Sequence, residues 1–227
     1  TAATCAQTPS RGAYFSVKFT VTVITTGTGT AGSATGISIG GSITATGNLN
    51  LSGVSTSGTG INFVTGKGIS GANIQAIGKT TNGVYGVLLN GTNTITTTGT
   101  SGDSLIEGIG GSGSTNALRA WSGLTLTSAN GTTLTLWGDG TSTTDRAARF
   151  DGTATTTGAV TLKGTSNNAT ALMLINGAVT ANANSALTMI GTTSSAGQSG
   201  VYFVNAGGVV LNDGATLNIT GQNTNAT

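Results

Sequence analysis

VYGVLLNGTNTITTTGTSGDSLIEGIGGSG, residues 84–113, contains three short apolar alternations separated by Asn, Gly and Ser. Each alternation has about four to six residues, which is too short for a helix, and none shows a helical period. Asn and Gly between such runs are typical of tight turns. The stretch therefore predicts three short β-strands joined by turns.

The same arrangement recurs along the chain, which indicates an internal repeat. Each unit opens with an apolar alternation, turns at Asn or Gly, passes through a Thr-rich strand, and closes with a Leu/Ile alternation that ends in Gly and a Ser/Thr tail. The glycine after the opening strand marks the register, and the longer intervals contain extra Gly/Ser/Asn-rich material, which a solenoid accommodates in loops. The register glycines are Gly41, Gly66, Gly91, Gly123, Gly152, Gly177 and Gly207, and the units span 36–58, 60–83, 84–113, 117–143, 146–169, 171–197 and 201–226.

Stacked units of this kind predict an all-β fold, a right-handed parallel β-helix of about seven coils with three short strands in each. One coil alone buries few side chains, but stacking at a strand spacing of about 4.8 Å aligns the aliphatic residues of successive coils into inner ladders. The alternation assigns these inward residues: Ile37, Ile39, Leu49, Leu51, Ile74, Ile77, Val87, Leu89, Leu134, Leu136, Val160, Leu162, Leu187, Met189, Leu217 and Ile219.

Short polar residues stand beside the register glycines in four units. Asn90, Asp151, Asn176 and Asn205 occupy this position. Asn and Asp tolerate a left-handed backbone and form hydrogen bonds across a turn. We therefore expect a stacked ladder of these side chains rather than a binding site.

Residues 1–33 do not fit the repeat and are assigned as an N-terminal segment, ahead of the β-helix over 34–227. YFSVKFTVTVIT, residues 14–25, alternates for longer than any other segment, which predicts one strand. This strand either caps the first coil, the interpretation we favour, or completes a neighbouring subunit as a donor strand and so builds a filament. The residues expected on its assembly face are Phe15, Val17, Phe19, Val21 and Val23.

The composition argues against several classes of protein. Charged residues make up 6% of the chain and its eight Lys and Arg are dispersed, so no basic stripe for nucleic acid is formed. No apolar run approaches the roughly 20 residues that span a bilayer. The sequence has no histidine and a single cysteine, which removes the common metal ligands and general bases. We expect no cofactor, no metal and no catalytic residue.

The remaining ionisable and aromatic residues leave three alternatives open. Asp139, Asp145 and Asp151 form the tightest group of carboxylates, which a metal site or a polysaccharide lyase or glycosidase on this fold would require, although surface ion pairs are the simpler interpretation. Thr-x-Thr rows could order water or ice, but the 29- to 32-residue intervals would interrupt such an array. The aromatic candidates for carbohydrate stacking are Tyr85, Trp121, Trp137 and Tyr202, and Trp137 could instead cover a core ladder.

The repeat resembles that of filamentous-haemagglutinin-type exoproteins, which are bacterial adhesins exported by two-partner secretion. The resemblance is carried by GVLLNGTNTITTTGTSG (86–102) and ALMLINGAVTANANSALTMIGTTSS (171–195). It covers about residues 34 to 227, the part of the chain in which the repeat is found. The Asn-Pro motifs of the family's secretion module are not found, because the only proline is Pro9. The resemblance implies a right-handed β-helix on the bacterial surface or outside the cell, with a role in adhesion or biofilm cohesion.

Together, the repeat and the scarcity of ionisable groups predict a non-enzymatic, extracellular structural or adhesive solenoid. Its expected partners are further copies of the chain, joined through coil ends or the N-terminal strand, and glycans of a host surface or matrix. A polysaccharide-degrading enzyme is the alternative function, and an ice-binding protein is a minor one.

Overall fold

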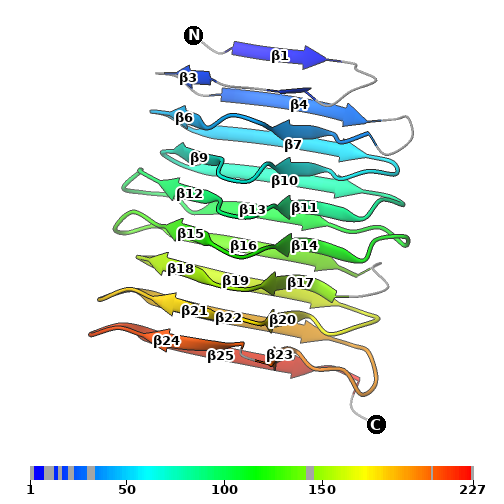
Figure 1. Cartoon of the computed structure of the whole chain (residues 1–227), viewed down its shortest axis with the longest axis vertical. Coiled ribbons are helices and arrows are strands. Elements are labelled where there is room, and N and C mark those ends of the chain that lie inside the picture. Colours follow the sequence, from blue (N-terminus) through cyan, green and yellow to red (C-terminus); the bar gives the residue numbers. More distant parts are fainter. Residues whose placement is uncertain are drawn as a thin grey trace.

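The computed structural model describes residues 3–7, 13–14, 17–19, 23–29, 34–141, 146–205 and 207–225, with the backbone alone for those up to residue 25. All regular structure in these residues is β-strand. Three parallel sheets, A, B and C, run the length of the molecule as the chain winds in right-handed coils (Figure 1). The predicted β-solenoid is confirmed.

The strands of each sheet lie in sequence order along the axis. Sheet A contains β1 (Ala3–Gln7), β4 (Val23–Gly29), β7 (Leu49–Ser55), β10 (Ile74–Thr80), β13 (Ser104–Ile109), β16 (Thr133–Gly140), β19 (Ala159–Ser166), β22 (Ala186–Thr193) and β25 (Thr216–Asn223). Sheet B contains β2 (Ala13–Tyr14), β5 (Ile37–Ile39), β8 (Ile61–Phe63), β11 (Tyr85–Leu89), β14 (Asn116–Ala120), β17 (Arg146–Asp151), β20 (Leu172–Ile175) and β23 (Val201–Val204). Sheet C contains β3 (Val17–Phe19), β6 (Ile43–Ala45), β9 (Gly68–Gly71), β12 (Thr94–Thr97), β15 (Leu124–Thr127), β18 (Ala154–Thr157), β21 (Ala178–Ala181) and β24 (Gly208–Leu211).

Each predicted unit is one coil with a strand from sheet B, then sheet C, then sheet A. The unit 84–113, for example, contains β11, β12 and β13. Neighbouring coils pair in parallel, so that Ile74 of β10 lies opposite Leu49 of β7. The three-strand coil read from the sequence is therefore confirmed in all seven units.

Aliphatic side chains from the three sheets fill the interior as one core cluster. Most of the predicted inward residues are fully buried, and one of them was assigned wrongly. Ile77 faces outward, because strict alternation from Ile74 places Ala76 in the core instead. Ile219 has the predicted inward position, in register with the buried Met189, but it is 43% exposed because no described coil lies beyond β25.

The glycine that closes each unit lies where sheets A and B converge. A Cβ atom added to Gly108 would lie 2.1 Å from the carbonyl oxygen of Ala117 in β14, so no side chain fits there. Glycines in register with Gly108 form one column through the sheet: Gly27, Gly53, Gly78, Gly138, Gly164, Gly191 and Gly221.

The Ser/Thr tail of the unit satisfies buried backbone groups at the same corner. The Thr80 hydroxyl is fully buried, donates to the Gly58 carbonyl at 2.9 Å and accepts from the Gly83 amide at 2.9 Å. Because a buried backbone polar group without a partner is costly, this hydroxyl stabilises the turn from sheet A to sheet B. Ser55, Ser166 and Thr193 play the equivalent part in their own coils.

In six of the seven repeat coils, the turn from sheet B to sheet C contains a residue with a left-handed backbone. It is glycine in four coils, at Gly66, Gly91, Gly123 and Gly152, and asparagine at Asn176 (φ 57°) and Asn205 (φ 55°). The Asn205 amide donates to the Asn176 side-chain oxygen at 2.8 Å, so the predicted ladder exists between these two residues. Asn90 is not left-handed, and Asp151 has a different role described below.

The prediction of one long strand over residues 14–25 is wrong. The described backbone of this region belongs to β2, β3 and β4, which pair with β5, β6 and β7 in three different sheets. Val17 and Phe19 lie in β3 and Val23 lies in β4, whereas Phe15 and Val21 lie outside the described residues. The described strands of 1–33 therefore extend the solenoid by one coil, and β1 adds a further strand to sheet A.

Candidate functional site

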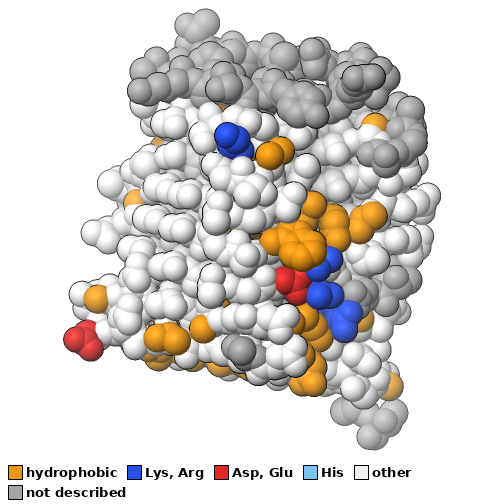
Figure 2. All heavy atoms as spheres, viewed as in Figure 1, with side chains coloured by type: hydrophobic (Ala, Val, Ile, Leu, Met, Phe, Trp, Pro, Cys, Tyr) orange, Lys and Arg blue, Asp and Glu red, His pale blue; other side chains and the backbone are white. Residues whose placement is uncertain are grey.

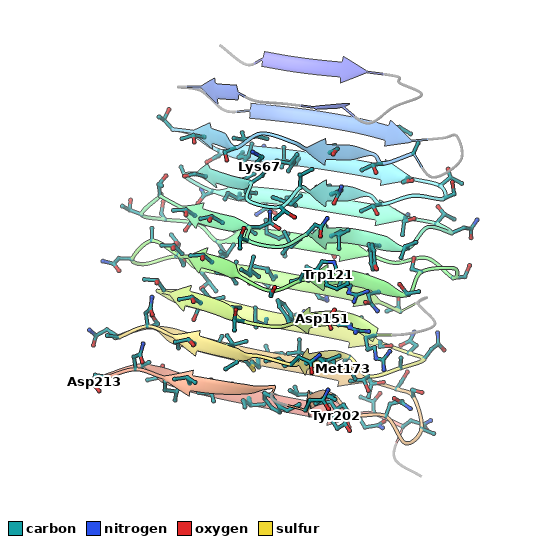
Figure 3. All side chains as sticks on the ribbon, viewed as in Figure 1. Lys67, Trp121, Asp151, Met173, Tyr202 and Asp213 are labelled. Atoms are coloured by element: carbon teal, nitrogen blue, oxygen red, sulfur yellow. The ribbon has the colours of Figure 1, made fainter. Side chains whose placement is uncertain are left out.

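Sheet B carries a cluster of charged and aromatic side chains on a molecule that has few of either. Figure 2 shows hydrophobic, basic and acidic side chains side by side on a face that is otherwise mostly polar and uncharged. Trp121, Asp151, Met173 and Tyr202 follow one another down this side of the solenoid (Figure 3). We call Tyr85, Arg119, Trp121, Arg149 and Asp151 the arginine–aromatic patch.

The alternation of β14 and β17 points two arginines outward. Leu118 is buried in the core, so its neighbour Arg119 faces away from it, and Arg149 lies in register with Arg119 on the next strand. Side chains opposite one another on neighbouring strands are close, and like charges there repel. The position therefore requires a compensating carboxylate.

Asp151 supplies that carboxylate at the end of β17. Its Oδ2 accepts from Arg119 Nε and Nη2, both at 2.7 Å, and its Oδ1 accepts from Arg149 Nε at 2.7 Å. The Asp151 side chain is only 10% exposed. Charge-assisted hydrogen bonds of this length are strong and directional, so both guanidinium groups are held in fixed positions.

The Arg119 guanidinium also organises two aromatic rings. It lies 3.9 Å from the centroid of the Trp121 ring, within the range of a cation–π interaction, and its Nη1 donates to Tyr85 Oη at 2.9 Å. Trp121 is nevertheless 40% exposed. The patch thus presents a large aromatic ring to solvent in an orientation set by the ion pair beneath it.

The line of outward side chains continues past the patch. Met173 lies in register with Arg149 but is only 4% exposed, and Tyr202, which is 47% exposed, lies in register with Met173. Beside them is an open hollow of about 290 Å³, whose polar walls include Thr170 and Gln198 in a hydrogen bond of 3.1 Å. The other lining side chains include Arg146 and Asn168.

Sheet A presents a second, smaller charged group. Trp137 faces outward there, with Lys163 Nζ 4.1 Å from its ring centroid and its own Nε1 donating to Thr165 Oγ1 at 3.3 Å, so it does not cover a core ladder. Burial raises the pKa of the Glu107 carboxyl, Asp139 raises it further, and Lys163 opposes the rise.

The structure does not bring the predicted carboxylate group together. Asp139 lies in β16 of sheet A and accepts from the Thr141 amide at 3.2 Å, whereas Asp151 lies in sheet B with both oxygens engaged by arginines. Asp145 lies outside the described residues. In the ranges that the structure describes, no group of three or more metal-binding side chains occurs.

From the sequence we identified Tyr85 and Trp121 as candidates for carbohydrate stacking, but we did not predict that Arg119 links them to Asp151. Arg119 lies 32 residues from Asp151 and 34 residues from Tyr85, and it contacts both because successive coils place such residues next to one another. An alignment of the opening strands of the units places Arg119 opposite Arg149. Two like charges in register repel, and this repulsion indicates that a carboxylate lies between them.

The arrangement offers stacking surfaces and hydrogen-bond donors on rigid strands. Both oxygens of Asp151 already accept hydrogen bonds from arginines, so its carboxylate serves to position the patch. An aromatic ring beside guanidinium groups can take up a ligand that has an apolar face and hydrogen-bond acceptors at its edge.

Within the residues that the structure describes, no helix is long and apolar enough to cross a membrane. Comparison with protein-family models, with curated proteins and with solved structures found no match to this chain.

Proposed function

We propose that this chain is an extracellular structural β-solenoid that mediates adhesion by binding saccharides through the arginine–aromatic patch. The observation that carries the proposal is the exposed Trp121 ring, held at 3.9 Å by an Arg119 that is itself fixed by Asp151. A ring fixed before binding loses little conformational entropy when a ligand stacks on it.

Saccharides fit the chemistry of this surface. A pyranose ring has an apolar face of C–H groups that packs on an aromatic ring, and hydroxyl or carboxylate oxygens at its edge that accept from guanidinium groups. The exposed rings of Trp121 and Tyr202 lie on one line along the solenoid axis (Figure 3). An extended polysaccharide lying along this line would contact several coils at once.

The resemblance to filamentous-haemagglutinin-type repeats supports the same role, because those proteins are adhesins of the bacterial surface. The parallel ladders of the solenoid support it as well, because they give a stiff scaffold that can display a binding surface away from the cell. Self-assembly through coil ends remains a prediction of the sequence.

The proposal is tested by measuring the binding of the purified chain to immobilised neutral and acidic polysaccharides. We expect Trp121→Ala to weaken binding about tenfold, since loss of one stacking contact costs about 1.4 kcal/mol. Trp137→Ala is the matched control: it removes the other tryptophan, which lies on sheet A, and we expect it to leave the affinity unchanged.

Two results would overturn the proposal. The first is that the wild-type chain binds none of the polysaccharides, and the second is that both tryptophan variants lose affinity equally. Shortening of a bound polysaccharide would instead support the degradative alternative, and it is followed in the same samples by assaying newly formed reducing ends.

A further inference from the structure

Sheet C presents a regular array of threonine hydroxyls that the proposed function does not use. Register pairing places the outward Thr94, Thr125, Thr155 and Thr180 in one column along the axis. A second column, two residues further along each strand, contains Thr44, Ser70, Thr96, Thr127 and Thr157. We call the two columns together the hydroxyl face.

The spacing within this face is set by the backbone. Hydroxyls of neighbouring strands are about 4.8 Å apart and those of a Thr-x-Thr pair about 6.6 Å apart, as the geometry of a parallel sheet requires. Threonine is branched at Cβ and has few rotamers, so its hydroxyl and methyl groups hold their positions. Buried Ile95 and Leu126 beneath the face further restrict movement of the strands.

The variable length of the coils does not interrupt the array. β12, β15 and β18 pair residue for residue, from Thr94 opposite Thr125 to Thr127 opposite Thr157. The extra residues lie outside sheet C, for example in the turns at 98–103 and 110–115. The irregularity expected from intervals of 29 to 32 residues is therefore absent over these three strands.

The hydroxyl face differs from the other two faces in charge. Among the described strands of sheet C from β6 to β24, none contains Asp, Glu, Lys or Arg. The surface over β12, β15 and β18 is accordingly white in Figure 2. The nearest charge is Lys67, which precedes β9 and lines a hollow together with Thr44, Ser70, Thr94 and Thr96 at one end of the face. Of the six outward threonines on these three strands, Thr157 accepts from Asn182 at 2.9 Å, and the other five hydroxyls have no partner in the described part of the protein.

We propose that the hydroxyl face binds the surface of ice through a layer of ordered water. A periodic, rigid set of uncharged hydroxyls with methyl groups between them can hold water at fixed distances, whereas charged groups would orient water around themselves. The two repeat distances of the face are comparable to oxygen repeats of the ice lattice. This site is independent of the saccharide patch, because it lies on another sheet.

The test is inhibition of ice recrystallisation by the purified chain. We expect the wild-type chain to restrict the growth of ice crystals and Thr155→Tyr and Thr125→Tyr to lose this effect, since each places a bulky ring within the array. Thr161→Tyr is the matched control, because Thr161 is an outward threonine of the same coil on sheet A. Circular dichroism confirms that each variant is folded.

Failure of the wild-type chain to restrict crystal growth would overturn the inference, as would an equal loss in Thr161→Tyr and Thr155→Tyr. Saccharide binding by the folded Thr155→Tyr variant is measured in parallel. We expect it to be unchanged, so that failure of the ice-binding inference and failure of the proposed adhesive function are distinguished.

Discussion

The column of inward glycines in sheet A sets the cross-section of the solenoid at the scale of single residues. Ile106 and its equivalents fill the wide part of the interior, and Gly108 lies two residues further along the strand, where sheet B approaches. A Cβ atom on Gly108 would lie 2.1 Å from the Ala117 carbonyl oxygen of β14. Because β14 is hydrogen-bonded to β11 on one side and β17 on the other, this carbonyl cannot move away easily. The glycine is thus required for steric reasons.

We expect Gly108→Ala to destabilise the fold by about 3 kcal/mol, because overpacking against fixed backbone forces strands apart. The measurement is the midpoint of thermal unfolding followed by circular dichroism. Gly221→Ala is the control within the same column, since the nearest atom to its Cβ would be Val201 N at 3.4 Å, an ordinary contact. Equal melting temperatures for the two variants would show that the close approach at Gly108 is not limiting.

Single residues also show where the sequence was sufficient and where it was not. The sequence shows the Leu/Ile alternation that ends in Gly and Ser/Thr. It does not show why the glycine is needed, because the convergence of sheets A and B is visible only in the three-dimensional structure. From the alternation we assigned both Ile74 and Ile77 as inward, but these residues are three apart and so face opposite sides of the strand. Ala76, the neighbour of Ile77, is buried instead. Ala76 lies opposite the inward Leu51 and two residues before the inward Gly78, so it faces the same side of the strand as they do.

At the scale of elements, β13, β16 and β19 bring scattered charges together on the outer face of sheet A. Glu107 lies in register with Trp137, and Trp137 with Lys163, whose ammonium group stacks on the indole ring. Burial and Asp139 both disfavour the ionised form of Glu107, and Lys163 only partly compensates. Because the pKa of Glu107 is raised by folding, the folded state binds its proton more tightly than the unfolded state does.

The consequence is that ionisation of Glu107 lowers the free energy of unfolding as the pH rises from the unfolded pKa to the raised folded pKa. We therefore expect Glu107→Gln to be more stable than the wild type at neutral pH, and this advantage to disappear below the unfolded pKa of glutamate. Denaturant unfolding at several pH values measures the difference. In Lys163→Met, NMR titration of the Glu107 carboxyl should give a still higher pKa, and a lower one would contradict the assigned interaction.

The candidate site shows why proximity along the chain was misleading for these elements. Asp139 and Asp151 are 12 residues apart, but the chain turns from sheet A to sheet B between them and the two carboxylates belong to different faces. Arg119 and Asp151 are 32 residues apart and share a hydrogen bond. In a solenoid the relevant neighbours are one coil apart, and coils of unequal length conceal that relation until the register is known.

At the scale of the whole molecule, each coil is buried by the next. Met189 in β22 is fully buried, whereas its register partner Ile219 in β25 is 43% exposed, although both are inward positions of the same column. At the other end, β2, β3 and β4 pair with β5, β6 and β7 and thereby cover the coil that contains Ile37 and Leu49. The strands of the first unit, β5, β6 and β7, therefore have their outer edges paired only as long as β2, β3 and β4 are present.

This arrangement makes a prediction for the N-terminal segment. Removing residues 1–33 uncovers the edges of β5, β6 and β7, and open parallel strands pair readily with another chain. We therefore expect the truncated chain to self-associate more strongly than the full chain, as measured by sedimentation velocity over a range of concentrations. The donor-strand hypothesis predicts the opposite, because a chain without its donor could not extend a filament.

Excision of residues 60–83 provides the control for this experiment. It removes one internal coil and joins residues 59 and 84, so β5 to β7 stack directly on β11 to β13 while both ends of the solenoid stay as they are. If open edges drive association, this variant should sediment like the full chain. Equal association of the two truncated chains would mean that loss of coils in general, and not exposure of β5 to β7, is responsible, whereas weaker association of the chain lacking residues 1–33 would favour the donor strand.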